Sequence, residues 1–118
     1  MSVNRFEDLR VWQLAKRFCD DIGVHVNGDT FVRDIALRNQ LNAASISTMA
    51  NIAEGFMHGG HREFARFVRI AAASNGEARA LLHAAYGRRY FAKGEYERLV
   101  EMTESIGRML RVLGSKLK

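Results

Sequence analysis

Two glutamates, Glu54 and Glu77, are the residues that most readily suggest chemistry in this chain. Both fall in segments with a helical period, and carboxylates on facing helices of a bundle can hold a pair of metal ions. Such centres also need Glu-x-x-His pairs, which place a carboxylate and an imidazole on one side of a helix. Here His58 follows Glu54 by four residues and His83 follows Glu77 by six, and no Glu-x-x-His occurs. The sequence therefore predicts neither a metal site nor a cofactor.

Other catalytic patterns are also missing from the sequence. The serines of the central region lack a neighbouring histidine and acid in a nucleophile motif. The glycines of "GFMHGGHRE" do not have the spacing of a phosphate-binding loop, and no strand is predicted before them. Cys19 falls on an apolar helical face and is predicted to lie in the core. No acid, base and nucleophile converge, so the sequence predicts a protein that is not an enzyme.

A structural role is predicted for the two glutamates instead. From Asn39 to Ala53 the chain has no charged residue, yet polar side chains recur on one side of the expected helix. Buried polar groups are tolerated when they are hydrogen-bonded or paired, and they can fix the register between helices. The predicted polar stripe consists of Gln40, Ser47, Asn51, Glu54, Ser74 and Glu77.

Glycine-containing breaks divide the chain into four segments with a helical period. The predicted helices span about 5–23, 31–57, 62–90 and 95–117, with Asp29 or Thr30 as the N-cap of the second. Four long helices with short connections predict an all-α, antiparallel up-down four-helix bundle, with residues 1–118 as a single domain. No apolar run is long enough to span a membrane, and the single cysteine suits a reduced, cytoplasmic location.

The outer sides of the second and third predicted helices are unusually poor in charge. A helix that is apolar nearly all round is normally covered on several sides, which predicts contact with another subunit. The third helix also places small residues four apart, which would let a second backbone approach closely. The alternative is a small-residue surface without a partner. The predicted oligomer interface consists of Ala72, Gly76, Ala80 and Ala84.

The net charge of +5 is concentrated in one part of the chain, where residues 61–93 hold seven basic and two acidic residues. A basic array of this kind can contact phosphates in a sequence-tolerant and salt-dependent manner. The alternative is a solvated charged surface without a ligand. The predicted nucleic-acid-binding residues are Arg62, Arg66, Arg69, Arg79, Arg88, Arg89 and Lys93.

Several motifs, in order, resemble the four-helix-bundle proteins encoded in intervening sequences of bacterial 23S ribosomal RNA genes. The family usually has Ser-Ile-Pro-Ser before the central asparagine, whereas this chain has Ser47-Thr48-Met49-Ala50, so a straighter second helix is expected. The similar stretches are "FEDLRVW" (Phe6–Trp12), Gln40 and Ala43-Ala44 leading to "NIAEGF" (Asn51–Phe56), "REFARFVRIAAAS" with Glu77, and "IGRML" (Ile106–Leu110).

The resemblance implies an up-down bundle that assembles as a ring-like homopentamer and is associated with ribosomal RNA genes. A related group, the accessory proteins of diversity-generating retroelements, uses a basic pentameric barrel to engage nucleic acid and a reverse transcriptase. Residues and resemblance together predict a non-enzymatic homo-oligomeric scaffold with weak, sequence-tolerant affinity for RNA or DNA. The alternative is an adaptor that recruits a partner protein without binding nucleic acid.

Overall fold

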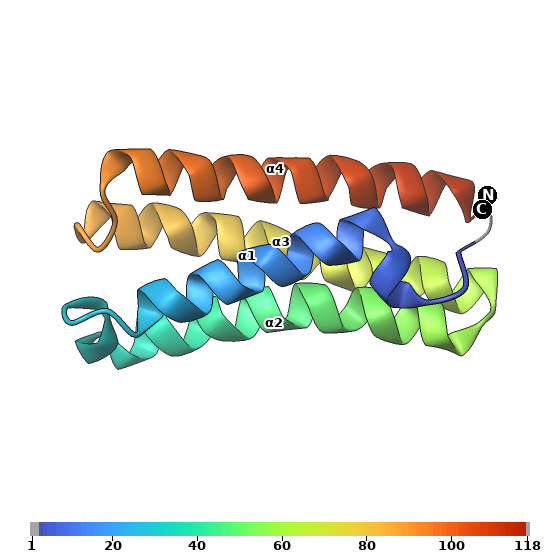
Figure 1. Cartoon of the computed structure of the whole chain (residues 1–118), viewed down its shortest axis with the longest axis horizontal. Coiled ribbons are helices and arrows are strands. Elements are labelled where there is room, and N and C mark those ends of the chain that lie inside the picture. Colours follow the sequence, from blue (N-terminus) through green and yellow to red (C-terminus); the bar gives the residue numbers. More distant parts are fainter. Residues whose placement is uncertain (1–2, 118) are drawn as a thin grey trace.

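Apolar residues that recur with a helical period build four long helices. The computed structural model describes residues 3–117, and within this range it contains helices and no strand. Successive long helices run in opposite directions along a rod of 43 × 22 × 20 Å (Figure 1). The predicted all-α fold of four packed helices is confirmed. In chain order the elements are η1 (Phe6–Asp8), α1 (Arg10–Val26), η2 (Phe31–Arg33), α2 (Ile35–His58), α3 (His61–Gly87) and α4 (Lys93–Lys116).

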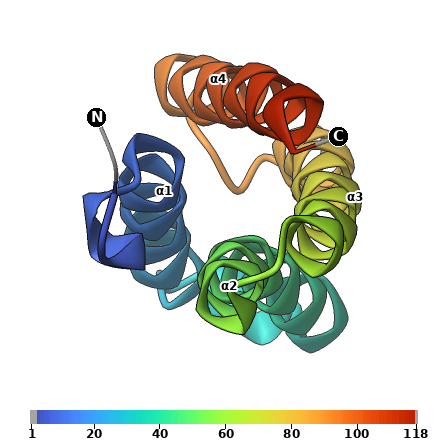
Figure 2. The ribbon, with the colours of Figure 1, turned by 90° about the vertical axis from the view of Figure 1, so that its right-hand side faces the viewer.

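The core lies along the axis of the bundle, where each long helix turns one line of apolar side chains inward. Seen from the end, the helices surround this core in the order α1, α2, α3, α4 (Figure 2). Packing is closest between α2 and α3 and sparsest between α1 and α4, so one seam of the bundle is relatively open. The largest fully buried apolar side chains are Phe18, Ile22, Val26, Leu41, Ile52, Leu82, Leu99, Ile106 and Leu110.

The beginning of α2 differs from the prediction. Neither Asp29 nor Thr30 caps this helix; the N-cap is Asp34, whose carboxylate accepts a hydrogen bond from the Leu37 amide at 3.3 Å. The cause is the short helix η2, which holds Phe31 buried against Tyr90, with ring centroids 4.7 Å apart. At the other end, α2 continues through Gly55 to His58 without interruption.

None of the helices described has an apolar stretch long enough to cross a membrane.

Candidate nucleic-acid interface

The first turns of α3 carry three exposed arginines, Arg62, Arg66 and Arg69, which we call the α3 patch. Their spacing places them on one side of the helix. Arg66 is paired with Glu63 at 3.2 Å and also lies over the Phe67 ring, 4.6 Å from its centroid. Arg62 and Arg69 have no carboxylate partner among residues 3–117. The α3 patch therefore presents cations that are available to an anionic ligand.

The other predicted nucleic-acid-binding residues lie elsewhere. Arg79 pairs with Glu104 at 3.2 Å, and Arg88 pairs with Asp34 at 2.6 Å. With a rise of about 1.5 Å per residue, the end of α3 that is followed by Arg88, Arg89 and Lys93 lies about 30 Å from the α3 patch. The structure thus brings together three of the seven predicted residues and places the others along or at the far end of the bundle.

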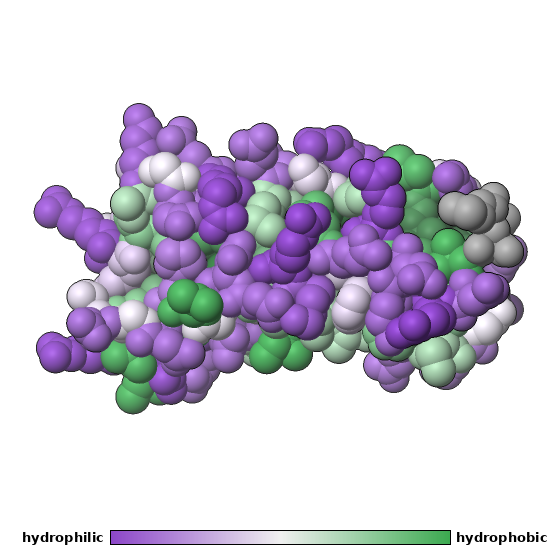
Figure 3. Space-filling view, viewed as in Figure 1, coloured by the Kyte–Doolittle hydropathy of each residue, from purple (hydrophilic) through white to green (hydrophobic). Residues whose placement is uncertain are grey.

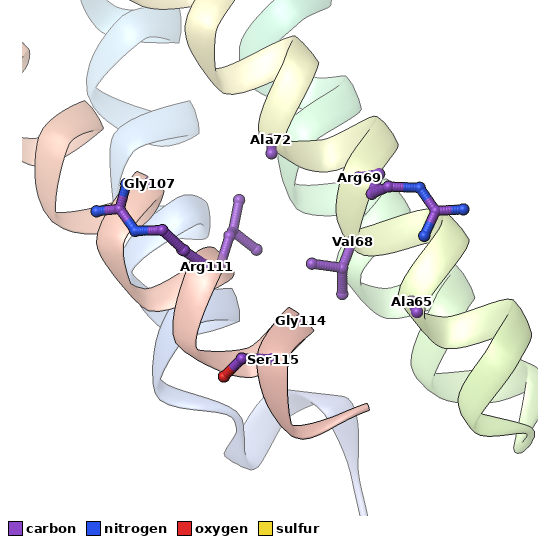
Figure 4. A pocket seen from close by; sticks show the side chains of 9 residues that line it. Ala65, Val68, Arg69, Ala72, Gly107, Arg111, Gly114 and Ser115 are labelled. Carbon is purple, nitrogen blue, oxygen red and sulfur yellow. The ribbon is translucent and has the colours of Figure 1, made fainter. Parts of the chain in front are cut away.

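A cleft between α3 and α4 extends the α3 patch. Its volume is about 480 Å³, with Arg69 on one wall and Arg111 on the other (Figure 4). The cleft is open because small residues line both helices there: Ala65, Ala72, Gly107 and Gly114.

Arg111 was not among the predicted residues. Four glutamates occupy the first half of α4, and their charge nearly cancels that of the basic residues when the whole segment is counted. The basic second half is therefore not evident from the net charge of the segment. A charge count over each half of the helix separately would have revealed it.

The polar stripe is only partly an internal feature of the bundle. Ser47 Oγ and Ser74 Oγ are hydrogen-bonded across α2 and α3 at 2.8 Å, and Asn51 Nδ2 donates to the Ser47 carbonyl at 2.8 Å. The remaining members are exposed in the single chain, because they lie on the outward margins of the two helices. These members are Gln40, Glu54 and Glu77. Burial of these three residues would require a second chain.

The possibility of a metal centre at the two glutamates gains no support from this geometry. Within residues 3–117, no three histidine, cysteine, aspartate or glutamate side chains gather closely enough to hold a metal ion. Cys19, predicted to lie in the core, is partly exposed.

The outer surfaces of α2 and α3 form a further continuous feature, which we call the α2–α3 face. Ile35, Ile46 and Met57 are 61%, 45% and 70% exposed. They recur every eleven residues, which aligns them along α2. Glu54 is the only exposed charged residue of this helix, histidine apart. The predicted interface residues on α3 are all exposed, but Ala72 lines the cleft between α3 and α4, so that Gly76, Ala80 and Ala84 contribute to this face. A Cβ atom added to Gly76 would meet nothing within 4 Å.

An antiparallel four-helix bundle with a basic patch at one end and an outer face that is poor in charge defines a class of small all-α proteins rather than an activity. Residues 7–112 match the model of the 23S rRNA-intervening sequence protein family, and the chain belongs to this family. The predicted resemblance is thereby confirmed.

A solved structure from Bacteroides thetaiotaomicron VPI-5482 shares the fold. It is described as a protein with unknown function from the S23 ribosomal protein family. The TM-score is 0.81 at 18% sequence identity, over 89% of this chain and 95% of that chain. At this identity, the likeness concerns the fold alone. A search of curated proteins found no significant match.

Proposed function

We propose that the protein is a non-enzymatic, homo-oligomeric scaffold that binds nucleic acid weakly and without strong sequence preference. The observation that carries this proposal is the α3 patch, whose unpaired Arg62 and Arg69 lie beside the cleft bordered by Arg111. Arginine guanidinium groups suit phosphate oxygens because their donors are planar and permanently charged. Contacts to phosphates alone carry no sequence information. They weaken as the salt concentration rises, because salt cations compete with the protein for the phosphates.

The α2–α3 face supports the oligomeric part of the proposal. Three large apolar side chains aligned along α2 remain in water in a single chain, and covering such surface contributes roughly 25 cal/mol per Å². We propose a ring of five copies, which is the assembly that the family resemblance implies. Each copy would repeat the α3 patch, so weak individual contacts would add through multivalency. RNA and DNA are both ligands under this proposal, because contacts to phosphates alone do not distinguish between them.

The proposal is tested by titrating a labelled single-stranded RNA and a labelled DNA duplex with the protein at about 50 mM salt, then at increasing salt. Binding should weaken steeply with salt, and Arg66→Glu with Arg69→Glu should abolish most of it. Arg33→Glu with Arg38→Glu makes the same charge change at the far end of the bundle and serves as the control. Absence of binding at the lowest salt, or equal loss in both double variants, would contradict the proposal.

A further inference from the structure

The relatively open seam between α1 and α4 contains a groove that the sequence-based prediction did not include. Its volume is about 450 Å³. α1 contributes Arg10, Arg17 and the polar side chain of Gln13. α4 contributes Arg108 and the polar side chain of Ser105. The three arginines are exposed. Three cations therefore border one hollow, from two helices that are distant in sequence.

No carboxylate lines this groove. Arg10 and Arg17 have no ion pair among residues 3–117, and Arg108 donates to the Ser105 hydroxyl at 3.1 Å rather than to an acid. Asp8, two residues before Arg10, is exposed, and the two acids within α1 are engaged in ion pairs. The pairs are Asp20 with Lys16 at 2.6 Å and Asp21 with Arg98 at 3.0 Å. The groove itself is thus lined by three arginines and no acid, although Arg17 also lines a neighbouring hollow together with Asp20 and Asp21.

The groove continues toward the end of the bundle. An adjoining hollow shares Arg10, Arg108 and Met109 with it and adds Lys116. From Ser105 to Lys116 the path follows α4 for about 16 Å, a stretch that contains no acidic residue. A single phosphate ester would engage only part of such a path, whereas a polyanion with regularly spaced charges can follow all of it.

The position of the seam separates it from the α2–α3 face. In the end view, α1 and α4 lie on the side of the bundle opposite the meeting of α2 and α3 (Figure 2). The face that contains α1 is largely covered by hydrophilic residues (Figure 3). If copies of the chain cover the α2–α3 face, the seam remains on the outside of the assembly.

From these observations we infer that the α1–α4 seam is a second nucleic-acid site, in which Arg10, Arg17, Arg108 and Lys116 contact a phosphodiester backbone. This inference rests on the proposed function, because it assumes that nucleic acid is the ligand. It adds a surface separate from the α3 patch. Arg108 lines the seam groove, and Arg111, which lines the cleft between α3 and α4, extends its guanidinium group away from α3 (Figure 4), so a strand that follows the last turns of α4 can contact both.

The test compares three double variants with equal loss of charge. Arg10→Gln with Arg108→Gln alters the seam, Arg62→Gln with Arg69→Gln alters the α3 patch, and Arg33→Gln with Arg38→Gln is the far-end control. The probes are a labelled single-stranded RNA and a labelled DNA strand of the same sequence, each titrated across a range of salt concentrations. Circular dichroism verifies that each variant keeps its helical content.

The seam variant should bind RNA on the order of 10- to 100-fold more weakly than wild type at about 50 mM salt, and its salt slope should fall by about 1.4, which corresponds to two lost contacts. The control should stay within about two-fold of wild type. Seam and control variants of equal affinity would overturn the inference, while the wild-type titration still supports the proposed function. Failure of the wild type to bind either probe would overturn both the inference and the proposed function.

The comparison of RNA with DNA tests which part of the nucleic acid the seam contacts. Equal weakening of RNA and DNA binding in the seam variant would identify the phosphate backbone as the shared determinant. A loss confined to one probe would overturn the assignment of these contacts to the phosphodiester backbone.

Discussion

Gly55 shows how one residue sets the distance between two helices. It lies inside α2 and is buried, and a Cβ atom at this position would lie 2.6 Å from Phe67 Cβ and 3.0 Å from Phe64 Cδ1. Phe67 Cβ is attached directly to the backbone of α3 and cannot rotate away. The glycine therefore allows the first turns of α3, which carry the α3 patch, to lie close against the end of α2.

Gly55→Ala is accordingly predicted to destabilise the protein. Overpacking costs about 1–3 kcal/mol, and the better helix propensity of alanine offsets about 1 kcal/mol of this. Urea unfolding followed by circular dichroism measures the difference. Gly23→Ala is the matched control, because a Cβ atom at Gly23 would meet nothing within 4 Å and the residue also lies inside a helix. The control should be neutral or slightly stabilising, and an equally tolerated Gly55→Ala would contradict the proposed close approach.

Asp34 joins the beginning of α2 to the turn after α3. Its carboxylate accepts hydrogen bonds from the Tyr90 hydroxyl at 2.9 Å, Arg88 Nη1 at 2.6 Å and the Leu37 amide at 3.3 Å. The Tyr90 hydrogen bond, followed by that from Arg88, holds the pKa of the Asp34 carboxyl below its ordinary value. The ionised form is therefore favoured in the folded state.

The lowered pKa gives a pH-dependent prediction. Because the folded-state pKa lies below the unfolded value of about 3.9, this carboxylate stabilises the fold above that pH and loses its contribution as the pH falls through the folded-state pKa. Asp34→Asn should therefore lower the Tm at pH about 7, and the difference from wild type should shrink on acidification. Thermal scans from neutral to acidic pH measure both quantities. A difference in Tm that stays constant over the whole range would show that charge is not the cause.

At the scale of helices, periodicity predicted the elements well, and it predicted the first residues of α3 and α4 more closely than those of α1 and α2. The four long helices follow from apolar side chains on one face, which the sequence displays directly. The start of α2 depends on Phe31 packing against Tyr90, a contact between residues far apart in the chain. No local pattern can indicate such a contact, so Asp34 could not be identified as the cap.

The cationic surfaces also differ in how far the sequence could predict them, because one groups residues that are close in sequence and the other groups residues from different helices. Arg62, Arg66 and Arg69 are close in sequence and share one side of α3, so their grouping could be predicted. Arg10 and Arg108 lie on different helices, and only the antiparallel arrangement of α1 and α4 brings them to one groove. The exposure of Glu54 and Glu77 likewise depends on which margin of the α2–α3 pair faces outward.

At the scale of the whole molecule, the surface divides into regions with different chemistry. The α2–α3 face consists mostly of apolar and small residues, with the exposed carboxylates of Glu54 and Glu77 at its margins, whereas the seam and the α3 patch are basic and lie toward the end where α3 begins and α4 finishes. An interface on this face would have to pair Glu54 and Glu77 or leave them at its rim, because burying an unpaired charge is costly. The seam lies on the side of the bundle opposite the α2–α3 face (Figure 2), whereas the α3 patch shares the outer side of α3 with Gly76 and Ala80 and is separated from them along the length of the bundle.

The proposed assembly predicts that one charge in the α2–α3 face disrupts it. Ile46 lies near the middle of the aligned apolar residues of α2, so Ile46→Glu would place a carboxylate inside the interface without disturbing the core of the single chain. Light scattering should give a multiple of 13.3 kDa for wild type and a mass near 13.3 kDa for the variant. Val24→Glu is the matched control, because Val24 is 73% exposed on α1, outside the α2–α3 face. The control should keep the wild-type mass, and a wild-type protein of 13.3 kDa at micromolar concentration would show that the α2–α3 face does not join copies of this chain.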